Sequence, residues 1–315
     1  MDEIMVSIVV PVYNHERYIE RALDSILMQK TTYSYEVLVG EDCSTDGTRE
    51  VLRNYEKKHP GKLQIFYREK NLSTAEYWNW ADLMRRTKGK YLITLEGDDF
   101  WLSDEKIQKQ VNFLENHPEY IAVSHNCIVV GENNQPNGEI YPECKDEEYT
   151  LWHYMFEILP GQLTTVMCRN FETQDLFDKS IIEGHISPGD RVLYFTLANN
   201  GKIYCMQEAL SAYRHIIHGG SSYSANVKYS FEHAEAWNKV LLDFAKKEGR
   251  FKGILTVEVL YLSTIIHGTK THVITCKKAR KYLKNVKYLI FACLIFVIRY
   301  IFLKSSRNPY KHFAG

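Results

Sequence analysis

The stretch Tyr91-Leu92-Ile93-Thr94-Leu95-Glu96-Gly97-Asp98-Asp99 decides the expected fold of this chain. Five aromatic, aliphatic and β-branched residues lead directly into a glycine that is surrounded by three carboxylates. An apolar run of this length, bounded by Lys90 and Gly97, predicts a β-strand that is buried on both faces. Its carboxyl end would bring Glu96, Asp98 and Asp99 to the edge of an open sheet, where α/β proteins bind their ligands.

Three carboxylates within four positions repel one another unless a positive charge lies between them. A hard divalent cation with oxygen ligands is the simplest source of that charge. The alternative is an ordinary polar turn after a strand, which an isolated Asp-Asp pair would fit equally well. The sequence before Tyr91 favours the cation.

Strands and helices alternate before this stretch. The patterns predict strands over 6–10, 35–39 and 63–67, and helices over 15–30 and 73–87. Between the second and third strands, capping residues over 44–48 predict a helix that carries Val51, Leu52 and Tyr55. The helix over 15–30 carries Ile19, Ala22 and Leu23 on the stripe that would pack on a sheet. Such alternation with short connections predicts an α/β protein with a doubly wound sheet of parallel strands.

The second half continues this pattern and then changes. We expect a helix from 103, a strand over 121–130, a polar and mobile loop over 131–148, a strand over 161–168, a buried helix over 192–198 and a strand over 202–206. From about residue 229 the pattern is helical, with helices predicted over 231–247, 254–266 and 277–304.

The composition excludes several classes of protein. The chain has 315 residues, enough for one large or two modest domains, and its 39 Lys and Arg balance its 39 Asp and Glu, so nothing indicates a nucleic acid partner. Its seven cysteines include no C-x-x-C pair, which predicts reduced thiols rather than a disulfide framework or a zinc site. The N-terminus lacks a basic segment and predicts no signal peptide.

Five motifs in order resemble the signatures of family 2 glycosyltransferases, which have the GT-A fold. They are Ser7-Ile8-Val9-Val10-Pro11-Val12-Tyr13-Asn14, Glu41-Asp42-Cys43-Ser44-Thr45-Asp46, Gly89-Lys90-Tyr91 with Glu96-Gly97-Asp98-Asp99, Ser187-Pro188-Gly189-Asp190, and Tyr213-Arg214-His215 with His218-Gly219-Gly220-Ser221. The resemblance spans roughly residues 5–224. It implies a GT-A, Rossmann-like sheet flanked by helices, with a C-terminal helical extension.

The resemblance also assigns the residues that bind the nucleotide. Pro11, Val12 and Tyr13 would form one wall of a base-binding slot, with backbone groups facing the nucleotide. Asp42 would accept the N3–H of uracil and so select a pyrimidine nucleotide. The alternatives are a strand-to-helix turn in which Tyr13 is merely packed, and an N-cap role for Asp42.

The acidic stretch occupies the position of the family's Asp-x-Asp motif, with Glu96 in the first place. This departure weakens any direct role of Glu96 at the metal. The resemblance implies that Asp98 holds ribose or metal and that Asp99 holds the metal. The cation would be Mg²⁺ or Mn²⁺, and it would neutralise the charge that develops on the leaving nucleotide diphosphate.

Asp190 matches the position of the family's general base, which deprotonates the acceptor hydroxyl and so gives inversion at the anomeric carbon. An N-cap Asp for the following helix is the alternative. Arg214 would bind the diphosphate, and His218 would bind phosphate or complete the metal shell, although the shifted spacing leaves His215 as an alternative to His218.

The resemblance implies a metal-dependent inverting glycosyltransferase that moves a sugar from a nucleotide diphosphate to a hydroxyl of a glycan or lipid-linked acceptor in cell-surface polysaccharide synthesis. The expected nucleotide diphosphate is UDP. The expected GT-A domain covers 1–228, with a nucleotide-sugar half over about 1–100 and an acceptor half over about 101–228. A sugar nucleotidyltransferase would need a Gly-rich phosphate loop where Pro11-Val12-Tyr13-Asn14 stands. The other alternative is a catalytically inactive nucleotide-sugar-binding or assembly protein of the same fold.

The remaining region, 229–315, contains a basic and apolar segment over about 277–311. Its continuously apolar run over 288–298 is too short to span a bilayer, and Arg299 would be costly at mid-membrane depth. Bases flank the run on both sides, which suits anionic headgroups. We expect a cytoplasmic protein that is peripheral on the inner face of the cell membrane; the alternative is a helix packed on protein.

Overall fold

The first half of the chain forms a parallel sheet, as the alternation predicts. In the computed structural model, which describes residues 3–72, 79–141, 144–170, 189–215 and 230–304, the parallel strands are β1 (Val6–Val12), β2 (Tyr35–Glu41), β3 (Gln64–Tyr67) and β4 (Tyr91–Thr94). They lie in the order β3-β2-β1-β4, so β1 is central and the carboxyl ends of β1, β2 and β4 meet at one edge.

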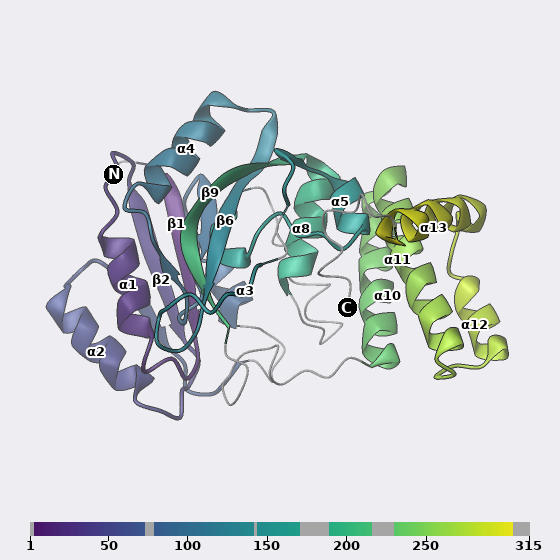
Figure 1. Ribbon diagram of the computed structural model, residues 1–315. Helices are drawn as coiled ribbons and strands as arrows, with labels where there is room; N and C mark the ends of the chain where they lie inside the picture. Colours follow the sequence, from purple (N-terminus) through teal and green to yellow (C-terminus); the bar gives the residue numbers. More distant parts are fainter. Residues whose placement is uncertain (1–2, 73–78, 142–143, 171–188, 216–229, 305–315) are drawn as a thin grey trace.

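Helices connect these strands and cover the sheet. They are α1 (Ile19–Leu27), α2 (Thr48–Lys58), α3 (Asn79–Met84) and, after the acidic stretch, α4 (Lys106–Asn116). Residues 73–78 of the predicted third helix lie outside the described residues. Figure 1 shows α1 and α2 at one end of the molecule and the C-terminal helices at the other.

The second half extends the same sheet with mixed strand directions. It adds β5 (Phe100–Trp101), β6 (Tyr120–Val130), β7 (Glu148–Tyr149), β8 (Met167–Arg169) and β9 (Lys202–Arg214). Strand β8 is antiparallel to both β4 and β6, whereas β6 and β9 are parallel. The GT-A-like mixed α/β class is therefore confirmed.

Two predicted strands have different bounds. Within 161–168, residues Leu163–Thr165 form the 3₁₀ turn η1, and only Met167–Arg169 pair as a strand. The strand predicted over 202–206 continues to Arg214, because β9 pairs with β6 along its length and with β5 near its end. That extension carries the chain back to the acidic stretch.

The sheet separates two hydrophobic clusters. Alternate β1 residues Val6, Ile8, Val10 and Val12 pack with α1, α2 and α4, as the two-residue period of a strand requires. Val9, on the opposite face, belongs to the larger cluster formed with α3, α5 (Leu151–Met155), α8 (Gly189–Asn200) and the C-terminal helices.

The C-terminal region is helical, as predicted, and contains α10 (Phe231–Glu248), α11 (Phe251–Lys270), α12 (Cys276–Leu283) and α13 (Leu289–Lys304). The single helix predicted over 277–304 is wrong, since α12 and α13 are separate. The reason is the buried carboxylate of Glu258 on α11, which accepts the backbone N–H groups of Lys287 at 2.6 Å and Tyr288 at 2.8 Å. These contacts satisfy free N–H groups at the start of α13.

Replacing Glu258 by alanine should leave two partly buried N–H groups without their acceptor. We expect the free energy of unfolding to fall by about 2–4 kcal/mol. Urea unfolding followed by circular dichroism measures this. Glu232→Ala, at an exposed position of α10, is the control and should change stability little. Equal stability of the two variants would contradict the capping role.

Candidate active site

The acidic stretch forms a tight turn at the carboxyl end of β4. Beyond Thr94 the chain stays beside β1, because Leu95 donates to the Val9 carbonyl at 2.9 Å and Gly97 donates to the Pro11 carbonyl at 3.2 Å. The Asp99 N–H then closes the turn on the Glu96 carbonyl at 3.0 Å. A side chain at position 97 would meet His15 Nδ1 at 2.6 Å, so the turn requires glycine there.

This turn brings three carboxylates together. Oxygens of Glu96, Asp98 and Asp99 lie within 4.8 Å of one another. Asp99 is 1% exposed, and its Oδ1 accepts the Arg214 backbone N–H at 2.7 Å while its Oδ2 accepts Gln162 Nε2 at 3.1 Å. Each oxygen therefore has a donor and retains a second lone pair, so the donor set suits a hard divalent cation.

Burial and mutual repulsion disfavour ionisation of the Glu96 and Asp99 carboxyl groups. Burial, and next the Asp98 charge, raise the pKa of Glu96 to about 8. The same two causes hold the pKa of Asp99 well above its usual range, although the Arg214 N–H opposes the shift. A cation between these groups would remove most of the repulsion.

Gln162 contributes to the site, although nothing in the sequence singled it out. Its Nε2 donates to Asp99 and reaches Glu96 Oε2 at 3.5 Å, while its Oε1 accepts the Thr164 N–H at 2.6 Å. The 3₁₀ turn that contains Thr164 thereby fixes the amide. Gln162 lies 63 residues beyond Asp99 in sequence, so only the fold reveals the pairing.

The guanidinium of Arg214 is committed to contacts within the protein. Its Nε donates to the Asp98 carbonyl at 2.8 Å, one Nη donates to the Gly131 carbonyl at 2.6 Å, and the other donates to Asn134 Oδ1 at 2.5 Å. Its charge lies 4.2 Å from the centre of the Tyr18 ring. The contact with a donor diphosphate predicted for Arg214 stays a prediction, and this geometry favours a role in positioning the acidic turn.

The same contacts fix part of the loop over 131–148. The Gly131 carbonyl accepts the Arg214 guanidinium, and the Gly131 N–H donates to the Gln135 carbonyl at 3.0 Å. The Asn137 N–H donates to the Val129 carbonyl at 3.2 Å. Tyr141 also lies beside the site, with its ring edge-on to Tyr213 at 5.4 Å. Burial, followed by the Asp190 charge, raises the pKa of Tyr141.

Asp190 lies in the first turn of α8, and its Oδ1 accepts the Arg191 N–H at 2.7 Å. Its charge is close enough to raise the pKa of Glu96, so the fold brings the predicted base to the acidic turn. Burial raises the pKa of Asp190 itself, while Arg191 opposes that shift. Neighbouring Tyr194 anchors the helix by donating to the Gly161 carbonyl at 3.1 Å.

Pro11, Val12 and Tyr13 lie at the carboxyl end of β1. The Pro11 carbonyl accepts Gly97, and the Val12 carbonyl accepts the Asp42 N–H at 2.9 Å, so both carbonyls are engaged in the fold. Val12 is buried in the core, whereas Pro11 and Tyr13 are partly exposed. In the predicted wall of the base-binding slot, only the exposed parts of Pro11 and Tyr13 are therefore available to a ligand.

Asp42 ends the neighbouring strand β2 and is buried. Its Oδ1 accepts the Leu72 N–H at 2.7 Å, and not an N–H of the α2 N-terminus. The N-terminus of α2 is instead served by Asp46, whose Oδ1 accepts the Thr48 N–H at 3.0 Å. Asn14, in the left-handed region with φ 57°, joins the two loops by accepting the Thr45 N–H at 2.8 Å.

Two histidines, His215 and His15, accompany the described part of the site. His218 lies outside the described residues. His215 Nδ1 lies 2.5 Å from Glu139 Oε2. His15, which the sequence did not single out, places its Nε2 3.9 Å from Asp98 Oδ2, and its buried Nδ1 has no hydrogen-bond partner among the described residues.

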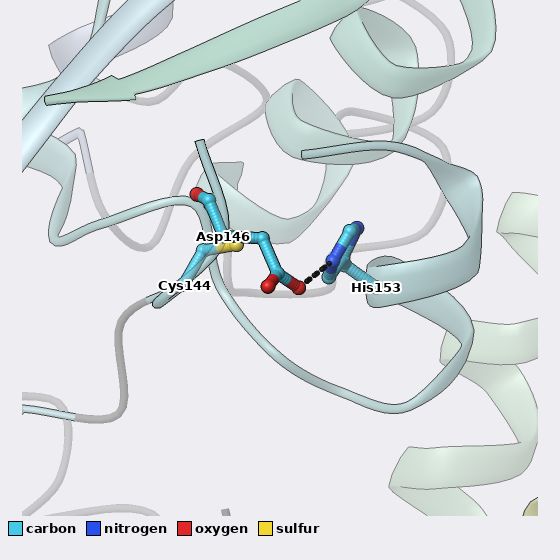
Figure 2. Close-up of side chains that lie close together, drawn as sticks. All are labelled: Cys144, Asp146 and His153. Atoms are coloured by element: carbon cyan, nitrogen blue, oxygen red, sulfur yellow. Dashed lines mark hydrogen bonds and ion pairs between the residues drawn. The ribbon is translucent and has the colours of Figure 1, made fainter. Parts of the chain in front are cut away.

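A second cluster of metal-ligating side chains lies before and within α5 (Figure 2). Ligand atoms of Cys144, Asp146 and His153 lie within 4.8 Å of one another. His153 Nε2 faces Asp146 Oδ2 at 2.8 Å, and its Nδ1 accepts the Thr150 N–H at 3.1 Å. Because Nδ1 is an acceptor, Nε2 carries the hydrogen and offers no lone pair to a cation. We interpret these contacts as a capping box for α5.

Comparison with known proteins agrees with this geometry. The model of glycosyl transferase family 2 matches residues 7–183. The chain is 29% identical over 221 residues to an uncharacterised protein of Mycobacterium tuberculosis, covering 68% of this chain and 59% of that protein. It is 38% identical over 110 residues to the putative teichuronic acid biosynthesis glycosyltransferase TuaG of Bacillus subtilis, covering 35% of this chain and 42% of TuaG. The chain thus spans about three-fifths or less of these relatives.

A solved structure shares the fold over nearly the whole chain. The crystal structure of S. aureus TarS 1-349 in complex with UDP-GlcNAc aligns with a TM-score of 0.62 and 16% identity, covering 94% of this chain and 89% of that one. The family match includes β1, the acidic turn and β8, and covers more than half of the chain. The chain therefore belongs to glycosyltransferase family 2, with the GT-A fold.

Proposed function

We propose that this protein is a metal-dependent, inverting glycosyltransferase that uses a nucleotide diphosphate sugar. The observation that carries the proposal is the buried acidic turn, in which Asp99 is held by Gln162 and Arg214 while Asp190 approaches from α8. An inactive binding protein would not need a further carboxylate, that of Asp190, close enough to act on the turn. Membership of a glycosyltransferase family supports the same reaction class.

In this proposal Asp98 and Asp99 hold Mg²⁺ or Mn²⁺, and His218 completes the metal shell. The cation, when bound, supplies positive charge to the diphosphate of the leaving group. Arg214 and Gln162 keep the carboxylates in place, so little reorganisation is needed when the donor binds. Glu96, whose pKa is raised to about 8, would add negative charge to the site once a bound cation favours its ionised form.

Asp190 then acts as the general base. Its carboxylate removes the proton of the acceptor hydroxyl while the hydroxyl oxygen attacks the anomeric carbon from the face opposite the leaving group. One such displacement inverts the anomeric configuration. The raised pKa of Asp190 makes it a stronger base than an exposed aspartate.

The proposed donor is a UDP-sugar, with Pro11, Val12, Tyr13 and Asp42 at the base and ribose. TarS, which shares the fold, binds UDP-GlcNAc. The proposed acceptor is a hydroxyl of a glycan or lipid-linked glycan in cell-surface polysaccharide synthesis, which the description of TuaG supports. Cytoplasmic nucleotide sugars would place this reaction in the cytoplasm.

Asp190→Asn tests the base. We expect UDP release from a panel of UDP-sugars to fall by roughly 100-fold or more, because the amide cannot take up a proton. UDP binding, measured by calorimetry, should remain within about threefold, since Asn can still accept the Arg191 N–H.

The matched control is Asp243→Asn, an exposed position of α10, which should retain full turnover. Undiminished turnover in folded Asp190→Asn protein would remove Asp190 from the mechanism. Absence of turnover in the unaltered protein, with UDP-sugar still bound, would favour the inactive binding protein instead.

The raised pKa of Glu96 predicts how pH affects the cation site. A carboxyl whose folded pKa is about 8 binds its proton more tightly in the folded state. Without a cation, its contribution to stability is present below about pH 4.5 and is lost as pH rises to about 8. Mg²⁺ competes with that proton, so its affinity should be roughly tenfold or more higher at pH 8 than at pH 6.

Thermal melting with and without Mg²⁺ at the two pH values measures this difference. Mg²⁺ should raise the melting temperature of the unaltered protein more at pH 8 than at pH 6. It should raise the melting temperature of Asp98→Asn little at either pH. Glu232→Gln provides a charge-matched control at an exposed position outside the site. A Mg²⁺ effect that is the same in Asp98→Asn and in the control would place the cation elsewhere.

A further inference from the structure

Helix α13 is apolar on two opposite faces, although a helix at a protein surface is normally apolar on one. Ala292, Ile295, Phe296 and Phe302 pack against the larger hydrophobic cluster. The opposite face is also apolar, with Ile290 77% exposed, Leu294 60%, Val297 53% and Ile301 63%. These four positions are separated by four, three and four residues, so they form one continuous stripe along the helix.

Further large side chains widen this stripe. Phe291, Ile298 and Tyr300 are each at least half exposed. No charged residue interrupts positions 289–303 except Arg299, which is buried. A contiguous apolar surface of this kind marks an interaction site rather than ordinary scattered exposure. We call the exposed apolar residues of 289–301 the α13 stripe.

Buried contacts fix the direction in which the α13 stripe faces. Arg299 donates from Nε to the Met155 carbonyl at 2.9 Å, from Nη1 to Ser263 Oγ at 3.1 Å and from Nη2 to Glu157 Oε2 at 2.5 Å. Glu258 holds the other end of the helix. The helix therefore keeps its stripe outward, and no helix within the described residues is long and apolar enough to cross a membrane.

The charged residues that follow Glu258 in the chain all have the same sign. After Glu258 the chain has eleven Lys and Arg and no Asp or Glu. Six of these bases are exposed on α12 and the turn before α13: Lys277, Lys278, Arg280, Lys281, Lys284 and Lys287. Figure 1 shows α12 and α13 together at the end of the molecule away from α1 and α2.

A partner with an anionic surface and an apolar interior would bind both the exposed bases and the α13 stripe. We propose that the α13 stripe, with the bases of α12, docks on an anionic phospholipid bilayer, with α13 lying in the plane of the membrane. Pairing with a second copy of this chain would cover the stripe but would bring the same uncompensated bases close together, which is unfavourable. This docking surface is separate from the proposed reaction and does not depend on it.

Vesicle sedimentation tests the proposal on the full chain. The unaltered protein should sediment with vesicles of phosphatidylcholine and phosphatidylglycerol, and much less with phosphatidylcholine alone. Lys277→Glu/Lys281→Glu should weaken binding to the anionic vesicles by roughly 30-fold or more, because two attractive charges are lost and two repulsive ones are added. Lys57→Glu/Lys62→Glu, exposed on and beside α2, is the matched charge control and should bind normally.

The apolar part is tested by Leu294→Glu, which should weaken binding by roughly tenfold or more. Ile140→Glu, at an equally exposed isoleucine outside the C-terminal region, is its control. Circular dichroism shows that each variant is folded. The proposal is overturned if the unaltered protein does not sediment with anionic vesicles. It is also overturned if each variant of the C-terminal region binds these vesicles as strongly as its control does. Dimerisation that Leu294→Glu abolishes, without vesicle binding, would assign the stripe to a second copy.

Discussion

The hydrogen bond from the Arg214 backbone N–H to the buried carboxylate of Asp99 joins the two halves of the GT-A fold. A buried carboxylate is costly unless donors and opposite charge surround it. Strand β9 supplies both, because its last residue donates this N–H and places a guanidinium behind the turn. The acidic turn at the end of β4 is thus formed by the first half of the chain but stabilised by the second.

A line of charged side chains connects this site with the C-terminal helices. Arg191, next to Asp190, lies 3.7 Å from Glu157, and the other oxygen of Glu157 accepts Arg299 on α13. Glu157 adopts φ 61°, which is unfavourable for a residue with a side chain. Arg191 of α8 and Arg299 of α13 therefore meet at one carboxylate, which lies just after α5.

The sequence predicts the parts of this fold that depend on local pattern. Apolar runs that end at Pro11, at Gly40-Glu41 and at Glu96-Gly97 identify β1, β2 and β4, and motif order identifies the acidic turn and Asp190. The partners of the turn were not predictable, because Gln162 and the Arg214 guanidinium act through contacts between residues far apart in sequence. The break between α12 and α13 likewise depends on Glu258, a distant residue on α11.

Packing makes the C-terminal helices part of the support for Asp190. Phe195 of α8 contacts Phe244 of α10 with ring centres 6.0 Å apart, and Arg250 donates to the Asn199 carbonyl at the end of α8 at 2.7 Å. Gly253 lies so close that a side chain there would meet Asn199 at 2.3 Å. Helix α8 is therefore held against α10 and α11, and α13 packs on α11 in turn. If α13 rests on a bilayer, as proposed, these contacts would fix the position of Asp190 relative to the lipid surface, as the proposed transfer to a lipid-linked acceptor would require.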